Sequence, residues 1–190
     1  MTTASGGPPD AAKRVRTTVL PHAADLFAER GPAATTMRDI ADRSGVNAGL
    51  IFRHIGTKEA VVTSVLEYLA ADLISARDAG APRAVVEARA ERSWKVIARA
   101  LLDGFDVTRL QSRFPNIDQL LADARDHYED DYTARVATAD ALAMQLGWRL
   151  FGPFLRVATG LDEQGVRDTP PPATSFISRH LGDPRGLRGD

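Results

Sequence analysis

The sequence predicts an all-α protein with two parts: a three-helix unit near the N-terminus and a larger helical region behind it. Three observations predict this class. Apolar side chains recur at the spacing of one helix face, glycine turns separate the periodic segments, and Val, Ile and Thr rarely run together. Hydrophobic residues make up 44% of the 190-residue chain, which is enough to form a packed core. We therefore expect helices throughout and no strand.

The first helix is predicted over residues 13–30, and Gly31-Pro32 should end it. Pro21 lies inside this range. Because a proline removes a helix hydrogen bond and clashes with the preceding turn, it predicts either a later start or a kink. Residues 1–12 show no apolar periodicity and are expected to form a disordered tail. One face of this helix carries the apolar side chains of Val19, Ala23, Leu26 and Phe27.

Two short helices should follow. Thr36 and Asp39 form the Thr-x-x-Asp pattern of a capping box, and Gly45 is placed to end the second helix. Asn47 is placed to cap a third helix that runs to about His54. Three helices joined by such short glycine turns make a helix-turn-helix. In that motif the second helix crosses the DNA backbone and the third enters the major groove, so the pattern predicts a DNA-binding domain.

Thr57 is placed to cap a fourth helix with a long apolar face. The Gly152-Pro153 pair should bend the last long helix. Further helices are predicted at residues 83–104, 107–113, 117–130, 132–161 and 173–181. The side chains expected to face inward from the first of these are Val85, Val86, Trp94, Ile97 and Leu101.

The segment TTMRDIADRSGVNAGLIFRHIGTKEAVVTSVLE, preceded by VLPHAADLFAERG, resembles the DNA-binding domain of the TetR family of bacterial regulators. The resemblance covers roughly residues 13–70. It rests on these positions, which agree in order and spacing: Leu26-Phe27, Gly31, Thr36, Ile40-Ala41, Gly45-Val46, Gly49, Phe52, His54 and Lys58-Glu59.

This resemblance implies a set of DNA contacts. Thr36 should give its amide and hydroxyl to a phosphate at a helix N-terminus, and Lys58 should pair with another phosphate. Apart from the resemblance, Arg38, Arg43 and Arg53 are candidates for phosphate contacts, with Arg38 the best of the three, but each is better explained as a solvated or salt-bridged surface arginine. The residues that open the recognition helix and should face base edges are Asn47, Ala48, Gly49 and Leu50, while Phe52 and His54 should contact the backbone and the groove walls.

Three positions depart from the family pattern. This chain has Ala48 where the family often has lysine or arginine, Leu50 where it often has threonine, and Phe52 where tyrosine is usual. The recognition surface should therefore be less polar than in its relatives. Leu50 is placed to contact the methyl group of a thymine, which is an apolar mode of base recognition.

For the rest of the chain, the resemblance implies a helical domain that binds a small-molecule effector and forms a homodimer. The expected bounds are a tail at 1–12, a DNA-binding domain at 13–58, an effector and dimerisation domain at 59–182 and a loose tail at 183–190. The apolar stretch Ala141–Leu161, with Ala173–Leu181, is the expected dimer surface. The side chains expected to line an apolar effector pocket are Trp94, Phe105, Phe114, Leu121, Tyr128, Met144, Trp148 and Phe151.

We interpret the chain as a sequence-specific regulator, a repressor that a small-molecule inducer releases from a palindromic operator. Two alternatives remain. One is a helix-turn-helix regulator without an effector, whose C-terminal domain (residues 59–182) serves dimerisation or a protein partner. The other is an all-α enzyme or metal-binding protein. His127 near Asp126, Asp130 and Asp131 is better explained as a solvated helix face than as a metal site. No catalytic arrangement and no cofactor motif is recognised.

Charge and composition agree with this interpretation. Residues 11–60 hold eight Lys or Arg against five Asp or Glu, whereas residues 61–190 carry an acidic excess. The basic N-terminal part is therefore the part expected to bind a polyanion. The chain has no cysteine, no apolar run of membrane-spanning length and no secretory pattern in its first ten residues. We therefore expect a cytoplasmic protein with no membrane partner.

Overall fold

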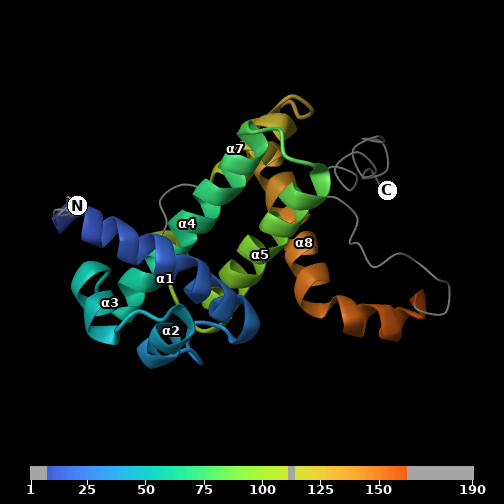
Figure 1. Cartoon of the computed structure of the whole chain (residues 1–190). Coiled ribbons are helices and arrows are strands. Elements are labelled where there is room, and N and C mark those ends of the chain that lie inside the picture. The colour runs from blue at the N-terminus through green and yellow to red at the C-terminus, as the bar shows by residue number, and fades with distance from the viewer. Residues whose placement is uncertain (1–7, 111–113, 162–190) are drawn as a thin grey trace, which may run out of the picture. The chain divides into compact units, whose positions relative to one another are not determined.

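The computed structural model describes residues 8–110 and 114–161, and these residues form helices and turns without a strand. The all-α class is therefore confirmed for this part of the chain. The chain divides into two compact units, residues 1–113 and 114–190. The helices are α1 (Pro8–Arg30), α2 (Met37–Ser44), α3 (Ala48–His54), α4 (Lys58–Asp78), α5 (Arg83–Leu102) and α6 (Val107–Leu110) in the first unit, and α7 (Pro115–Arg125) and α8 (Asp131–Thr159) in the second (Figure 1).

Helix α1 lies at the centre of the first unit and packs against α2, α3, α4 and α5 (Figure 1). Its side chains Val19, Ala23 and Phe27 are fully buried. Helices α2 and α3 each contribute one fully buried isoleucine, Ile40 and Ile51. Helix α4 adds the largest apolar share: Val61, Val62, Val65, Leu66, Leu69 and Leu73. The three-helix head, which consists of α1, α2 and α3, therefore shares one continuous core with α4 and α5.

The start of α1 corrects two predictions. The helix begins at Pro8, so residues 8–12, which were expected to belong to a disordered tail, are helical. Prolines are well suited to a first helical turn, where the missing amide has no partner to lose. A later start at Pro21 was also wrong, because the helix runs through it. Arg92 of α5 donates to the carbonyl of Pro21 at 2.6 Å and pairs with Asp25 at 2.7 Å, which holds this part of α1 in place.

Helix α5 begins close to its predicted start, but its buried face differs from the one expected. Val85 and Leu101 were expected to face inward and are exposed. The buried residues of α5 are Ser93, Val96, Ala98 and Ala100. Small side chains allow close approach of neighbouring helices, and α5 packs against both α1 and α4. Val86, Trp94 and Ile97 are half-buried, so helix spacing was wrong for Val85 and Leu101 and missed the small side chains that are most deeply buried.

In the second unit, α7 and α8 pack on each other through small side chains, among them Ala124, Ala134 and Ala141. Helix α7 ends at Arg125, earlier than the predicted residue 130, because Asp130 instead caps α8 by accepting the amide of Thr133 at 2.8 Å. Figure 1 shows α8 changing direction in its C-terminal part, which contains Pro153. The predicted helix 173–181 and the tail 183–190 lie outside the described residues.

Burial in the shared core predicts the stability of the head. Leu66 is buried between the helices of the first unit, whereas Leu102 at the end of α5 is exposed. Leu66→Ala should lower the free energy of unfolding by about 2–5 kcal/mol, because it removes buried methyl groups and leaves a cavity. The matched Leu102→Ala should change it by less than about 0.5 kcal/mol. Urea unfolding followed by circular dichroism measures both, and equal losses would contradict this packing.

Candidate nucleic-acid interface

Helix α2 begins at a complete capping box. The hydroxyl of Thr36 accepts the Asp39 amide at 3.1 Å, and the Asp39 carboxylate accepts both the Thr36 amide at 2.7 Å and the Thr36 hydroxyl at 2.8 Å. These bonds, with the nearby charge of Arg30, hold the pKa of the Asp39 carboxyl below its ordinary value. Gly45 ends the helix in the left-handed region, at φ 68°, as the sequence predicted. The bounds of α2 are thus fixed by local chemistry.

The capping box changes the role expected for Thr36. Its amide and hydroxyl were predicted to bind a phosphate, but in this structure both donors are directed to Asp39. The competing acceptor lies three residues along the same chain and is therefore always available. The following amides of the first turn, those of Met37 and Arg38, have no partner within the helix. They are the donors that α2 can offer to a phosphate.

Two ion pairs hold α2 against the end of α1. Arg43 forms a two-pronged pair with Glu29, with nitrogen to oxygen distances of 3.1 and 3.0 Å. Arg30 lies 3.0 Å from the Asp39 carboxylate. The interaction with Arg43 lowers the pKa of Glu29. Arg43 is therefore a structural arginine, in agreement with its low rank among the three candidate phosphate contacts.

Helix α3 presents an apolar outer surface. Asn47 caps it by accepting the Gly49 amide at 2.8 Å, and Ile51 is fully buried on the inner side. Leu50 and Phe52 point outward, and their exposed fractions are 44% and 63%. Exposure of two large apolar side chains on one short helix is costly in water, so this face is a candidate contact surface.

The remaining residues predicted on this surface are also accessible. Gly49 is exposed, while Ala48 and His54 are half-buried. A Cβ at Gly49 would lie 3.1 Å from the Asn47 side-chain oxygen, so the absence of a side chain keeps this cap intact. The first turn of α3 therefore offers a close approach to a ligand, as the prediction of base-edge contacts requires.

A basic side chain is exposed on each of the two helices α2 and α3. The Arg38 side chain is 90% exposed, and its closest carboxylate, that of Asp42, is 4.0 Å away. Such a long surface pair contributes little and leaves the guanidinium available. Arg53 is exposed on α3 next to Phe52, and no ion pair to it is found among the described residues. Arg53 ranked below Arg38 as a candidate from the sequence, yet its position on α3 makes it equally suitable.

Lys58, which was expected to pair with a phosphate, instead makes hydrogen bonds within the protein. Its ammonium donates to the carbonyls of Thr35 and Ala33, the latter at 3.4 Å. Burial lowers the Lys58 pKa, and the nearby carboxylate of Asp103 partly opposes this effect. The prediction of a phosphate contact therefore applies to at most one of the three N–H groups of Lys58. Its other bonds support the turn that precedes α2.

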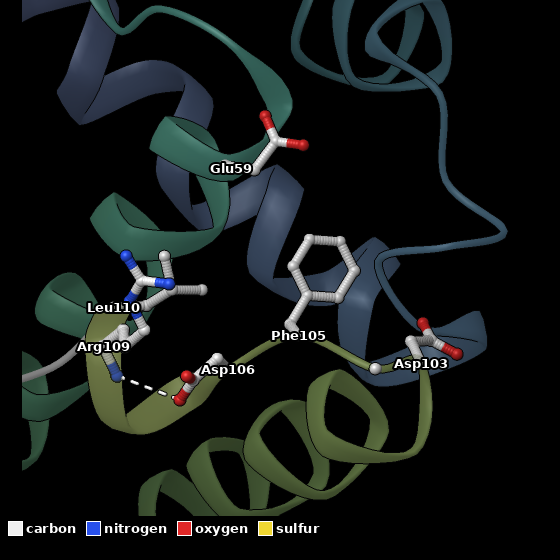
Figure 2. A pocket seen from close by; sticks show the side chains of 7 residues that line it. Glu59, Asp103, Phe105, Asp106, Arg109 and Leu110 are labelled. Carbon is white, nitrogen blue, oxygen red and sulfur yellow. Dashed lines mark hydrogen bonds between the residues drawn. The ribbon is translucent and has the colours of Figure 1, made fainter.

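The residues predicted to line an effector pocket are distributed over both units. Trp94 is half-buried on α5, and Phe105 lines an open cavity of about 480 Å³ with Glu59, Asp103 and Arg109 (Figure 2). A second hollow, along α5, is lined by none of the predicted residues. In the second unit, Phe151 is exposed, and the residues that are half-buried are Phe114, Leu121, Tyr128, Met144 and Trp148. Burial raises the pKa of the Tyr128 hydroxyl.

Two further features bear on the alternatives. The His127 ring lies 2.8 Å from the carbonyl of Asp123 through Nδ1, and the described residues contain no cluster of three or more metal-ligating side chains. In the same part of the chain, none of the helices has the length and apolarity needed to cross a lipid bilayer.

A rigid three-helix head with an exposed third helix defines a helix-turn-helix protein of the DNA-binding class. Residues 19–65 match the bacterial regulatory proteins of the tetR family. The chain is 52% identical over 155 residues to the HTH-type transcriptional repressor Rv3405c of Mycobacterium tuberculosis, and the match covers 82% of each chain. Identity and coverage are the same for the HTH-type transcriptional regulator Mb3439c of Mycobacterium bovis. The HTH-type transcriptional repressor KstR2 of Rhodococcus jostii is 48% identical over 58 residues, or 30% of this chain and 28% of that protein.

The chain therefore belongs to the tetR family of bacterial regulatory proteins and is a DNA-binding regulator of transcription. The family resemblance drawn from residues 13–70 is confirmed. The match to the mycobacterial proteins extends far beyond the head, since it covers 155 residues.

The lowered pKa of Asp39 predicts how the head responds to acid. A carboxylate whose folded pKa lies below its unfolded value of about 3.9 stabilises the fold above that pH, and this contribution is lost as the pH falls through the folded pKa. The free energy of unfolding should therefore fall more steeply below about pH 4 in the wild type than in Asp39→Asn. Urea titrations across this range measure it.

Thr36→Val provides the matched control, because it removes the hydroxyl but keeps the amide that donates to Asp39. Its acid response should lie between those of the wild type and Asp39→Asn. Identical acid responses in all three proteins would contradict the assigned role of the capping box.

Proposed function

We propose that this protein represses transcription by binding a palindromic operator as a homodimer, and that a small-molecule effector releases it. The observation that carries the proposal is the outer surface of α3, where Leu50, Phe52 and Arg53 are exposed, with Arg38 exposed on the neighbouring α2. The arginines supply phosphate contacts that orient the head, and the apolar side chains supply base contacts. A cytoplasmic location fits this activity.

Repression is supported by the relatives. Rv3405c, 52% identical over most of its length, is named a repressor, as is KstR2 of Rhodococcus jostii. A repressor that acts by occupying its site needs affinity and specificity for DNA. The head supplies both kinds of contact. The proposed DNA contacts therefore come from helices that the structure describes.

The dimer proposal rests on the C-terminal part of α8. Phe151, Phe154 and Val157 are exposed there, and Phe154 has 69% of its surface accessible. An apolar surface of this kind is expected to be covered by another protein surface. A second copy of the chain is the proposed partner, through Ala141–Leu161 and the segment 173–181 outside the described residues. A two-fold dimer would require two half-sites about one helical turn, or a multiple of it, apart.

The proposed effector needs a pocket lined by apolar side chains. Of the eight side chains expected to line its pocket, Phe105 lines the larger of the two cavities above, and the other seven line neither. The second candidate function that the sequence left open is a regulator without a small-molecule effector, whose C-terminal domain serves dimerisation or a protein partner. Bound small molecules extracted from the purified protein and identified by mass spectrometry would favour the effector.

Selection of duplexes from a random-sequence pool by the wild-type protein tests the function directly. Specific proteins bind their sites about 10³-fold or more tighter than other DNA at the same salt concentration. The selected sequences should contain an inverted repeat, and footprinting should protect both halves. A selected duplex bound no more tightly than a scrambled one would contradict the proposal.

Leu50 gives a prediction about base recognition. Replacement of one contacted thymine by deoxyuridine removes a single methyl group. For the wild type this should weaken binding about fourfold, the value of one buried methyl group, about 0.8 kcal/mol. Leu50→Ala should bind both duplexes with equal affinity. Fluorescence anisotropy measures this, with Leu102→Ala as an exposed leucine control outside α3. A wild type insensitive to every such replacement would show that Leu50 contacts no thymine methyl.

Arg38 gives a prediction about phosphate contacts. If Arg38 neutralises one phosphate, Arg38→Ala should lower the slope of log affinity against log salt by about 0.9. It should also weaken binding to selected and scrambled duplexes about equally. Arg43→Ala is the matched control, because Arg43 is occupied by Glu29. A slope unchanged in Arg38→Ala would place this side chain outside the interface.

A further inference from the structure

The turn between α1 and α2, residues 31–36, is held by a residue far away in the sequence. The Asp103 carboxylate, just after the last residue of α5, accepts a hydrogen bond from the Ala33 amide at 2.7 Å. The two residues are 70 positions apart. A bond of this length to a charged acceptor is among the stronger hydrogen bonds in proteins. It links the end of α5 directly to the entrance of the helix-turn-helix.

The shape of the turn also fits this carboxylate. Gly31 adopts φ +83°, a conformation that side chains disfavour. A Cβ at Gly31 would lie 2.6 Å from the same Asp103 oxygen, which is closer than atoms can approach without displacement. Gly31 therefore permits both the turn and the close contact with Asp103. Two separate observations, one a hydrogen bond and one steric, place the carboxylate against this turn.

Lys58 holds the same turn from the start of α4. Its ammonium donates to the carbonyls of Ala33 and Thr35. The Ala33 residue is thus bound at its N–H by Asp103 and at its C=O by Lys58. The negative charge of Asp103 also favours the charged form of Lys58 against its burial. Asp103, Ala33 and Lys58 together form a connection between α5, the turn and α4.

This connection fixes the residue that begins α2. The turn ends at Thr36, the N-cap of α2, and Thr35 is fully buried next to it, with its hydroxyl donating to the Gly31 carbonyl at 2.8 Å. Any movement of the turn therefore moves the N-terminus of α2. We propose that Asp103 is a positioning residue for DNA binding: its carboxylate sets the orientation of the helix-turn-helix from the end of α5. This inference rests on the proposed function.

The charge of Asp103 makes the proposal easy to distinguish from a simple electrostatic effect. A carboxylate near a DNA-binding surface repels phosphates, so its removal should strengthen binding if charge alone matters. A positioning role predicts the opposite, because the turn is released. Asp106 supplies the matched control: it lines the same open cavity (Figure 2), and its carboxylate accepts bonds from Thr108 and Arg109 within its own turn.

The experiment measures the affinity of the full-length protein for a duplex selected by the wild type and for a scrambled duplex of the same composition. Asp103→Ala should bind the selected duplex about 10-fold more weakly, while its salt dependence stays that of the wild type because the cationic side chains that meet phosphates are unchanged. Asp103→Asn, which keeps a side-chain oxygen to accept the Ala33 amide, should recover most of this affinity. Asp106→Ala should bind as tightly as the wild type or more tightly.

Hydrogen exchange of the Ala33 amide, measured without DNA, reports the hydrogen bond itself. Exchange should be faster in Asp103→Ala and unchanged in Asp106→Ala. If Asp103→Ala binds the selected duplex as tightly as Asp106→Ala does, or its Ala33 amide stays protected, the positioning role is wrong while the proposed function stands. A wild type without preference for any selected duplex would overturn the proposed function and this inference with it.

Discussion

The burial of one face of α1 is the constraint on which the rest of the structure depends. Val19, Ala23 and Phe27 are fully buried on this helix, which packs against four others. Since α2 and α3 are only eight and seven residues long, neither would be stable alone in water. They persist because Ile40 and Ile51 are buried in the core of this unit. The exposed surface of α3 is therefore held in place by the packed core of the longer helices beneath it.

Polar contacts then fix the position of each element on that support. Arg43 with Glu29 and Arg30 with Asp39 bind α2 to α1, while Arg92 binds α1 to α5. Most of these pairs are exposed, so each adds little stability by itself. Each pair instead fixes the position of one helix on another, because its two side chains meet in only one arrangement of those helices. Apolar burial supplies the free energy of folding, and the charged pairs select one arrangement of the head.

The features that the sequence predicted correctly are those encoded within a few residues. The caps at Thr36, Asn47 and Thr57 all act over two or three positions, and each is confirmed. The features that it missed depend on contacts between distant segments. Asp103 meets Ala33 across 70 residues, and no periodicity marks that contact. The small buried residues of α5, Ser93, Ala98 and Ala100, were also missed, because close helix packing there selects small side chains.

The central claim is that the outer face of α3 contacts bases, with Leu50 against the major groove. Replacement of Leu50 by a photoreactive diazirine amino acid, followed by irradiation of the complex, tests it most directly. Crosslinks to one base in each half of the selected duplex, absent with a scrambled duplex, are predicted. Crosslinks only to the sugar-phosphate backbone, or equal yields with both duplexes, would contradict the account.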